Sequence, residues 1–235
     1  MKKLLLFAAI AVFASCSSDD NNQKDPINDS QSEPILKIAK QTSIYNGDLY
    51  YYYGENGYVS EIRSVQQGSD ILTKYNYNGN KIINKRYYKD GQANGGMDFF
   101  YNSAGLISET VTIGINPIVK VRYEYDSNKV LIKSENYSND VLSFSTQYQH
   151  IGNNCTRKDV TMSDGTIVTN IYKFDLNSVQ TTKYSETPEI KKIFTWGDNV
   201  VIEDTGLKFD IEFNAKKYPV KLAIDGEVIG TFSYH

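Results

Sequence analysis

The sequence predicts an all-β fold, an antiparallel up-and-down meander of about 16–18 strands. Two observations carry this prediction. An aromatic-x-aromatic step recurs about every 24 residues, and each copy alternates apolar and polar side chains before a turn rich in Asn, Asp and Gly. No stretch shows the 3.6-residue periodicity of an amphipathic helix, so we expect strands and turns throughout the folded part of the chain.

The step recurs at Tyr51/Tyr53, Tyr75/Tyr77, Phe99/Tyr101, Tyr123/Tyr125, Tyr148/His150, Tyr172/Phe174, Phe194/Trp196, Ile211/Phe213 and Phe232/Tyr234. Its first members are separated by 24, 24, 24, 25, 24, 22, 17 and 21 residues. In one copy, Tyr123 and Tyr125 face one side while Arg122 and Glu124 face the other, as in a strand that is buried on one face. A turn and a second strand follow each step, so one repeat is a β-hairpin with its connection.

A strongly twisted open sheet rarely exceeds about ten strands. We therefore expect the meander to curl into a barrel-like or spiral wrap, or to fold over as a two-layer stack.

The N-terminus, residues 1–15, has the form of a lipoprotein signal peptide. Lys2 and Lys3 precede an apolar run that is too short to span a membrane as a helix. The tetrapeptide Phe13-Ala14-Ser15-Cys16 resembles a bacterial lipobox, with Phe13 where an aliphatic residue is usual. The resemblance implies that Cys16 carries a lipid; the alternative is an ordinary secretory signal that ends near a cysteine.

Residues 16–34 are almost entirely polar, and we expect a disordered tether there. The pair Asp19-Asp20 resembles the export signals of Bacteroidetes surface lipoproteins, which implies a place in the cell envelope, at the outer membrane, with surface exposure left open. Residues 35–235 then form a single β-repeat domain.

The pattern Y-x-Y-[DN]-x-x-G/N resembles the YD repeats of RHS-type proteins. With the lipobox and the acidic tether, residues 45–235 resemble YD-repeat-like lipoproteins of Bacteroidetes, although the Gly-Arg pair of true YD repeats is absent. This resemblance implies a β-meander envelope lipoprotein and supplies no active site.

The charge and the cysteine content limit which binding partners and which disulfide or metal sites are expected. Without residues 1–15 the chain holds 23 basic and 28 acidic residues, a net charge of −5, and no basic block. This argues against a nucleic-acid partner and leaves the N-terminal lipid as the expected membrane contact. If Cys16 is lipidated, Cys155 stands alone, so neither a disulfide nor a cysteine-based zinc site is expected.

The sequence offers few candidate catalytic residues, and we expect neither enzymatic activity nor a cofactor. His150 occupies an aromatic slot of the repeat, His235 is the last residue, and Cys155 at a strand start is expected to be a small packed residue. The acidic residues fall mostly in turns or at outward strand positions, and no calcium-loop motif is present.

Four aromatic residues fall out of phase with the core rings: Tyr50, Tyr52, Tyr87 and Phe100. Exposed rings on a wide sheet suit contact with a sugar or with a protein. The sequence therefore predicts a non-enzymatic envelope protein that binds a glycan or an envelope-protein partner. The alternatives are an adhesin-like spacer without a small ligand and a polysaccharide hydrolase that uses two carboxylates.

Overall fold

The computed structural model describes residues 37–44, 47–178 and 199–235, and within them every regular element is a β-strand. The first nine strands are β1 (Ile38–Ser43), β2 (Gly47–Tyr53), β3 (Val59–Gln66), β4 (Ser69–Asn78), β5 (Lys81–Lys89), β6 (Gln92–Tyr101), β7 (Ile107–Ile113), β8 (Val119–Tyr125) and β9 (Leu131–Ser138). The others are β10 (Val141–Ile151), β11 (Asn154–Met162), β12 (Ile167–Asp175), β13 (Val200–Asp204), β14 (Leu207–Lys208), β15 (Asp210–Phe213), β16 (Pro219–Ile224) and β17 (Glu227–Tyr234).

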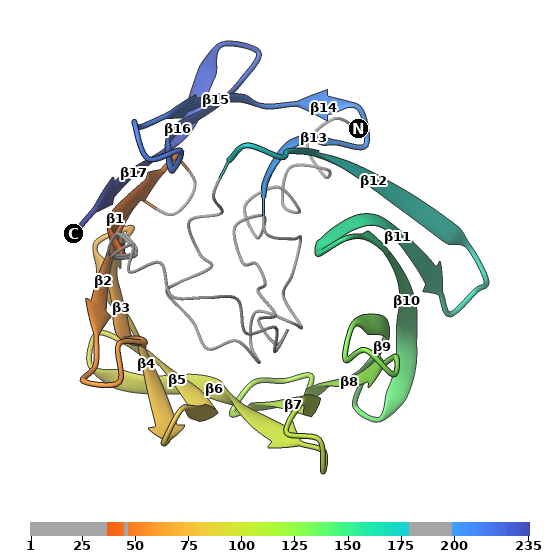
Figure 1. Ribbon diagram of the computed structural model, residues 1–235. Coiled ribbons are helices and arrows are strands. Elements are labelled where there is room, and N and C mark those ends of the chain that lie inside the picture. The colour runs from red at the N-terminus through yellow and green to blue at the C-terminus, as the bar shows by residue number, and fades with distance from the viewer. Residues whose placement is uncertain (1–36, 45–46, 179–198) are drawn as a thin grey trace, which may run out of the picture.

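These 17 strands form one antiparallel meander that nearly closes into a barrel, seen as a ring in Figure 1. Each strand from β1 to β13 pairs with its successor. Strand β15 pairs with β16, β16 with β17, and β17 returns to β1. The structure thus confirms the predicted meander, and of the shapes expected from the sequence it shows the barrel-like wrap.

The aromatic pairs line the inner face of the ring. One core cluster is built on Ile82, Phe99 and Ile107, with Tyr75, Tyr77, Met97, Tyr101, Tyr123 and Tyr125 packed against it. A second is built on Tyr172, Val200, Val201, Phe209, Leu222, Ile229 and Phe232. The aromatic pairs within the described ranges lie where the period-two alternation predicted, whereas Phe194/Trp196 lies outside the described residues.

Where the second ring of a pair is a tyrosine, its hydroxyl ties that strand to an earlier strand. The hydroxyl of Tyr77, for example, donates a hydrogen bond to the carbonyl of Val59 at 2.6 Å. The same bond joins Tyr53 to Ile38, Tyr101 to Ile82, Tyr125 to Ile107 and Tyr234 to Pro219, at 2.6–2.9 Å. The repeat therefore places a hydrogen-bond donor, as well as a ring, at a fixed position in the wall.

The turn after the aromatic pair is closed by an Asn or Asp side chain. The Oδ1 atom of Asn102 accepts hydrogen bonds from the amides of Ala104 and Leu106, both at 3.0 Å. Asp126 and Asn214 do the same in two other repeats. Such Asx turns account for the Asn or Asp that directly follows the second ring in these repeats.

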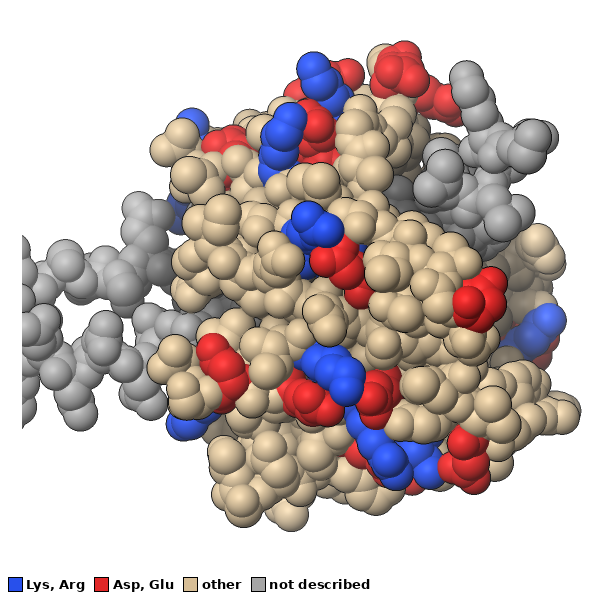
Figure 2. All heavy atoms as spheres, turned by 90° about the vertical axis from the view of Figure 1, so that its right-hand side faces the viewer, with Lys and Arg blue, Asp and Glu red and all other residues tan. Residues whose placement is uncertain are grey.

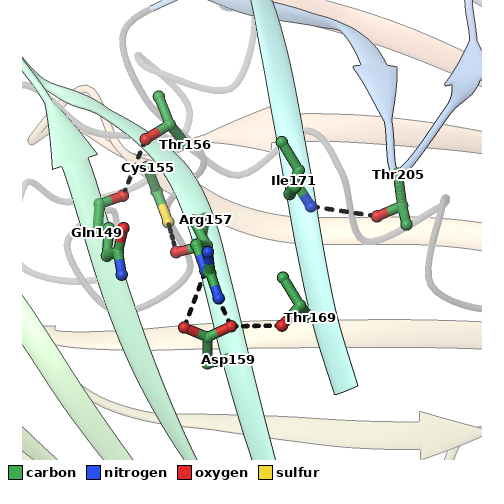
Figure 3. A network of polar contacts seen from close by, with 8 residues as sticks. All are labelled: Gln149, Cys155, Thr156, Arg157, Asp159, Thr169, Ile171 and Thr205. Atoms are coloured by element: carbon green, nitrogen blue, oxygen red, sulfur yellow. Dashed lines mark hydrogen bonds and ion pairs between the residues drawn. The ribbon is translucent and has the colours of Figure 1, made fainter. Parts of the chain in front are cut away.

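The outer wall of the ring carries many charged side chains, with exposed apolar ones such as Phe100 and Ile171 between them. Lysine and arginine alternate with acidic residues across neighbouring strands, and Figure 2 shows these opposite charges side by side on one part of the wall. Examples are the ion pairs Arg122–Glu109, Lys133–Glu124 and Lys173–Glu203. Figure 3 shows a further cluster, in which Asp159 accepts hydrogen bonds from Arg157 at 2.9 Å and from the Thr169 hydroxyl at 2.6 Å.

Candidate binding site

The candidate binding site is a row of four side chains that crosses the outer wall from β2 to β5. Tyr50 pairs with Arg63, Arg63 with Leu72, and Leu72 with Tyr88. Directly opposed residues of an antiparallel sheet project from the same face, so these four side chains stand in one line. A tyrosine ring lies at each end of the row, and an arginine and a leucine lie between the rings.

This row lines a groove of about 530 Å³, which we call the tyrosine groove. Its lining is completed by Ser64, Val65, Asp70, Ile71, Lys74 and Gly91. Val65 is 62% exposed and Tyr50 is 42% exposed, so the groove offers apolar surface that is open to solvent. Aromatic and aliphatic surface combined with a few polar groups is the usual composition of a ligand site.

Cations are held in place around the rings of this groove. The Nζ atom of Lys40 lies 5.2 Å from the centre of the Tyr50 ring, and that of Lys74 lies 5.9 Å from the Tyr88 ring. Glu61 accepts a hydrogen bond from Nε of Arg63 at 2.9 Å and approaches Lys74 Nζ at 3.6 Å. The hydrogen bond to Glu61 also raises the pKa of the Arg63 guanidinium.

The structure separates the four aromatic residues that the sequence singled out. Tyr50 lies in the tyrosine groove. Tyr52 follows it on β2, is 46% exposed and has the Arg63 guanidinium carbon 4.9 Å from its ring centre. Phe100 is 49% exposed but lies on β6, four strands from β2. These rings do not join into one patch. The predicted lipid-attachment residue, Cys16, lies outside the described residues.

Tyr87 requires a correction, because it does not share the face of Tyr50. It pairs with Thr73, which is two residues from the core ring of Tyr75, so Tyr87 faces inward. A register shift between Asn76 and Tyr77 sets two residues of β5, Ile83 and Asn84, in succession on the outer side. Counting by twos from the core rings of neighbouring repeats misses this bulge.

Tyr88, and not Tyr87, is the residue of this pair that faces outward. Its opposition to Leu72 places it in the tyrosine groove, where it becomes the counterpart of Tyr50. Because neighbouring residues of a regular strand face opposite sides, one ring of the adjacent pair Tyr87-Tyr88 faces outward in either register. This adjacency was the sequence signal that could have pointed to Tyr88.

His150 and Cys155 have the structural roles that the sequence predicted. Nε2 of His150 lies 2.9 Å from the carbonyl oxygen of Leu131, which is the bond that tyrosine makes in other repeats. Cys155 is fully buried, its thiol donates to the carbonyl of Arg157 at 3.5 Å (Figure 3), and burial raises its pKa. A raised pKa disfavours the nucleophilic thiolate.

Two further observations concern the described ranges alone. No group of three or more His, Cys, Asp and Glu side chains in them is arranged so that it could hold a metal ion. They also contain no helix with the length and hydrophobicity needed to cross a bilayer.

No protein-family model matches the sequence, and neither does any curated protein. Among solved structures, the chain is similar to a porin-like protein from Bacteroides uniformis ATCC 8492, with a TM-score of 0.54 and 6% identity over 86% of this chain and 99% of that one. At this identity the likeness shows the fold, a β-barrel.

Two weaker likenesses are to toxin assemblies. They are the Photorhabdus luminescens Tc holotoxin pore (TM-score 0.35, 13% identity) and TcdB2-TccC3 (TM-score 0.34, 11% identity), each over 81% of this chain. The present chain spans 11% and 12% of those chains.

Proposed function

We propose that this chain is a non-enzymatic, lipid-anchored protein of the cell envelope that binds a saccharide in the tyrosine groove. The observation that carries the proposal is the outward row Tyr50–Arg63–Leu72–Tyr88, with a ring at each end and a charged hydrogen-bond donor between the rings. The fold likeness to a Bacteroides porin-like protein supports a place in the envelope.

The dimensions of the row suit an oligosaccharide. Tyr50 and Tyr88 are three strand spacings apart, a span of about 14 Å. The C–H-bearing face of a sugar ring stacks on an aromatic face, and its hydroxyls need partners at the edge. Arg63, Lys74 and Asp70 line the same groove and supply donors and an acceptor of that kind.

The outer wall supports anchoring by lipid over insertion of the wall itself. A membrane-spanning β-barrel presents an apolar band about 25 Å tall to the lipid. Here the middle of the wall carries ion pairs such as Arg122–Glu109 and Lys133–Glu135, whose charges would be costly to place in hydrocarbon. An N-terminal lipid on Cys16 holds such a wall beside the membrane and in water.

The distribution of carboxylates supports a binding role over a hydrolytic one. Glycoside hydrolysis uses two carboxyl groups across one substrate site. Asp70 is the carboxylate among the residues that line the tyrosine groove. A second pocket is lined by Glu203 and Asp210, of which Glu203 is ion-paired with Lys173.

A glycan array probed with the full chain tests the proposal, with a Cys16→Ala background to avoid detergent. We expect saturable binding to a subset of saccharides, reduced at least about tenfold by Tyr50→Ala or Tyr88→Ala, because each change removes a stacking face. Phe100→Ala is the matched control, since it removes an equally exposed ring from another part of the wall and leaves binding unchanged.

Other outcomes separate the alternatives. If Phe100→Ala reduces saccharide binding as much as Tyr88→Ala does, the tyrosine groove is not the binding site. The same holds if Tyr88→Ala leaves binding unchanged. Capture of one envelope protein that depends on Tyr88, with no glycan bound, reassigns the groove to a protein partner. Release of shortened saccharides from the array ligand indicates hydrolysis.

A further inference from the structure

Two cations line the middle of the tyrosine groove, Arg63 from β3 and Lys74 from β4. Glu61 lies beside both, because it stands two residues before Arg63 on the same strand and pairs directly with Lys74 across the sheet. The side chains of Arg63 and Lys74 are 56% and 46% exposed, so a ligand can reach both of them from solvent. The middle of the groove therefore offers two accessible positive charges that share one carboxylate.

Glu61 leaves hydrogen-bond donors of both cations open to the groove. Nε and Nη2 of Arg63 donate to Oε2 of Glu61, whereas Nη1 of Arg63 donates to no described residue. Nζ of Lys74 lies 3.6 Å from Oε1 of Glu61, which is beyond the length of a hydrogen bond, and it has no acceptor elsewhere in the described ranges. A second carboxylate in the groove could therefore accept hydrogen bonds from Nη1 and Nζ while Glu61 keeps its place.

The acid that lines the groove, Asp70, lies away from these donors. It precedes Lys74 by four residues on β4, a distance of about 13 Å along the strand. Asp70 pairs with Val65, whereas Lys74 pairs with Glu61, so the two charges stand on opposite sides of the row through Arg63. The groove is therefore positive along its Lys74 side and negative along its Asp70 side.

We propose that the ligand of the tyrosine groove is an acidic saccharide whose carboxylate is bound by Lys74 and Arg63, a proposal that rests on the saccharide binding proposed above. A guanidinium presents its N–H groups in a plane that matches the two oxygens of a carboxylate. Hydrogen bonds between charged groups are also stronger than those between neutral ones. Uronic acids, which carry a carboxylate on the sugar ring, are the class of saccharide that fits.

The two tyrosine rings set where the carboxylate lies. Nζ of Lys74 is 5.9 Å from the centre of the Tyr88 ring, so a sugar that stacks at Tyr88 carries its carboxylate next to this ammonium. Arg63 stands between Lys74 and the Tyr50 end of the row, and the saccharide extends over it. Exposed ion pairs contribute little to stability, so Arg63 and Glu61 can adjust to the ligand at low cost.

The test compares tetrasaccharides of uronic acids with their methyl esters, which keep the sugar rings and lose the charge. The panel holds tetrasaccharides of galacturonate, glucuronate and mannuronate, and the protein is the full chain carrying Cys16→Ala. We expect at least one acid to bind about tenfold more tightly than its methyl ester, because only the acid makes charged hydrogen bonds. The difference should shrink as sodium chloride is added, because salt screens exposed charges. Titration calorimetry measures both affinities.

Three variants locate the carboxylate. Lys74→Gln should weaken binding of the acid by about tenfold and leave the weaker binding of the ester unchanged, because it removes a charged donor. Glu61→Gln should strengthen binding of the acid by several-fold, because it removes a carboxylate that repels the ligand. Lys173→Gln is the matched control, since it removes an exposed, ion-paired lysine from β12, on the opposite side of the ring in Figure 1, and should leave binding of the acid unchanged.

The outcomes separate an acidic ligand from saccharide binding in general. Equal affinity for acid and ester, with both lost on Tyr88→Ala, keeps a saccharide in the groove and overturns its acidic character. Binding of the acid that neither Lys74→Gln nor Glu61→Gln changes overturns it as well. Binding of a sulfated neutral tetrasaccharide, with no uronate bound, replaces the carboxylate by a sulfate. If no saccharide binds, charged or neutral, the proposed function fails and the acidic ligand fails with it.

Discussion

At the scale of single residues, the repeat depends on a buried ring that keeps a hydrogen bond. A phenol placed against the core loses water, and its hydroxyl needs a protein acceptor. The carbonyl of an aliphatic residue in an earlier strand supplies it, as in Tyr101 with Ile82 at 2.7 Å. Burial raises the pKa of Tyr53 and Tyr234 further above neutral pH, because the charged phenolate loses its water.

His150 shows that an imidazole can take the place of the phenol in this bond. Its imidazole keeps the bond to Leu131, so His150→Tyr should preserve the fold at equal or higher stability. His150→Phe keeps the ring but leaves the carbonyl without its partner, and should lower the free energy of unfolding by about 1 kcal/mol. Urea unfolding at pH 8 measures both changes. Equal stability of the Phe and Tyr variants would show that the hydrogen bond contributes nothing.

The same histidine predicts a pH dependence. Burial lowers the pKa of His150 below its ordinary value of 6.5, with a further lowering by Lys158, while the bond to Leu131 and the charge of Asp126 oppose the shift. The unfolded chain therefore takes up a proton near pH 6.5 that the folded chain takes up only at lower pH. The stability that depends on neutral His150 is full above pH 6.5 and is lost as the pH falls below it.

This dependence is measured as a difference between two proteins. The free energy of unfolding of His150→Tyr minus that of the unaltered chain should be constant from pH 8 to 7 and should increase as the pH falls toward 5. Subtraction removes the contributions of carboxylates such as Asp159, which titrate in both proteins. A difference that stays flat down to pH 5 would contradict the lowered pKa.

At the scale of elements, the hairpin is defined by its Asx turn. Asn102 accepts two amide hydrogen bonds, and its own amide donates to the carbonyl of Leu106 at 2.9 Å. Asn102→Ala removes the side-chain acceptor and should cost about 1 kcal/mol. Asn102→Asp should be tolerated, because Asp126 makes the same two bonds in the next repeat. The midpoints of urea unfolding of the two variants measure these changes in stability. Equal losses of stability for Asn102→Ala and Asn102→Asp would show that the side-chain acceptor does not stabilise the turn.

The sequence predicts these elements well because local rules set them. Period-two alternation assigned Tyr123 and Tyr125 to the core, and Asn and Asp marked the turns correctly. It failed at Tyr87 and Tyr88, where the bulge in β5 moves every later side chain to the other face. A bulge is decided by pairing with the neighbouring strand, which a single sequence does not display. The tyrosine groove forms because the register of four neighbouring strands sets its side chains in line. The sequence does not display that register, so only Tyr50 of the groove was predicted to face outward.

At the scale of the whole molecule, closure of the ring determines which surface meets water. Pairing of β1 with β17 removes two sheet edges and turns the aromatic face inward, so the ion-paired face becomes the outer wall. The remaining irregularity lies between β13 and β15, where the chain leaves β13 and pairs with β16. The outer wall carries ion pairs among scattered apolar side chains. A membrane-spanning barrel instead presents a continuous apolar band to the lipid.

This difference leads to a prediction about the proposed lipid anchor. If the lipid on Cys16 is the only membrane contact, Cys16→Ala should move the full chain from the membrane fraction to the soluble fraction of the cell or medium. The wall would stay folded in water, since its ion pairs Lys133–Glu135 and Arg157–Asp159 already face solvent. Cell fractionation followed by detection with an antibody measures where the protein is, and metabolic labelling with a fatty acid measures whether it carries a lipid.

Ser17→Ala is the control, because it changes the neighbouring residue and leaves the cysteine in place. A Cys16→Ala protein that remains in the membrane after a carbonate wash, at the level of the control, would mean that the wall itself inserts. The ion-paired outer face would then have to be covered by something other than lipid.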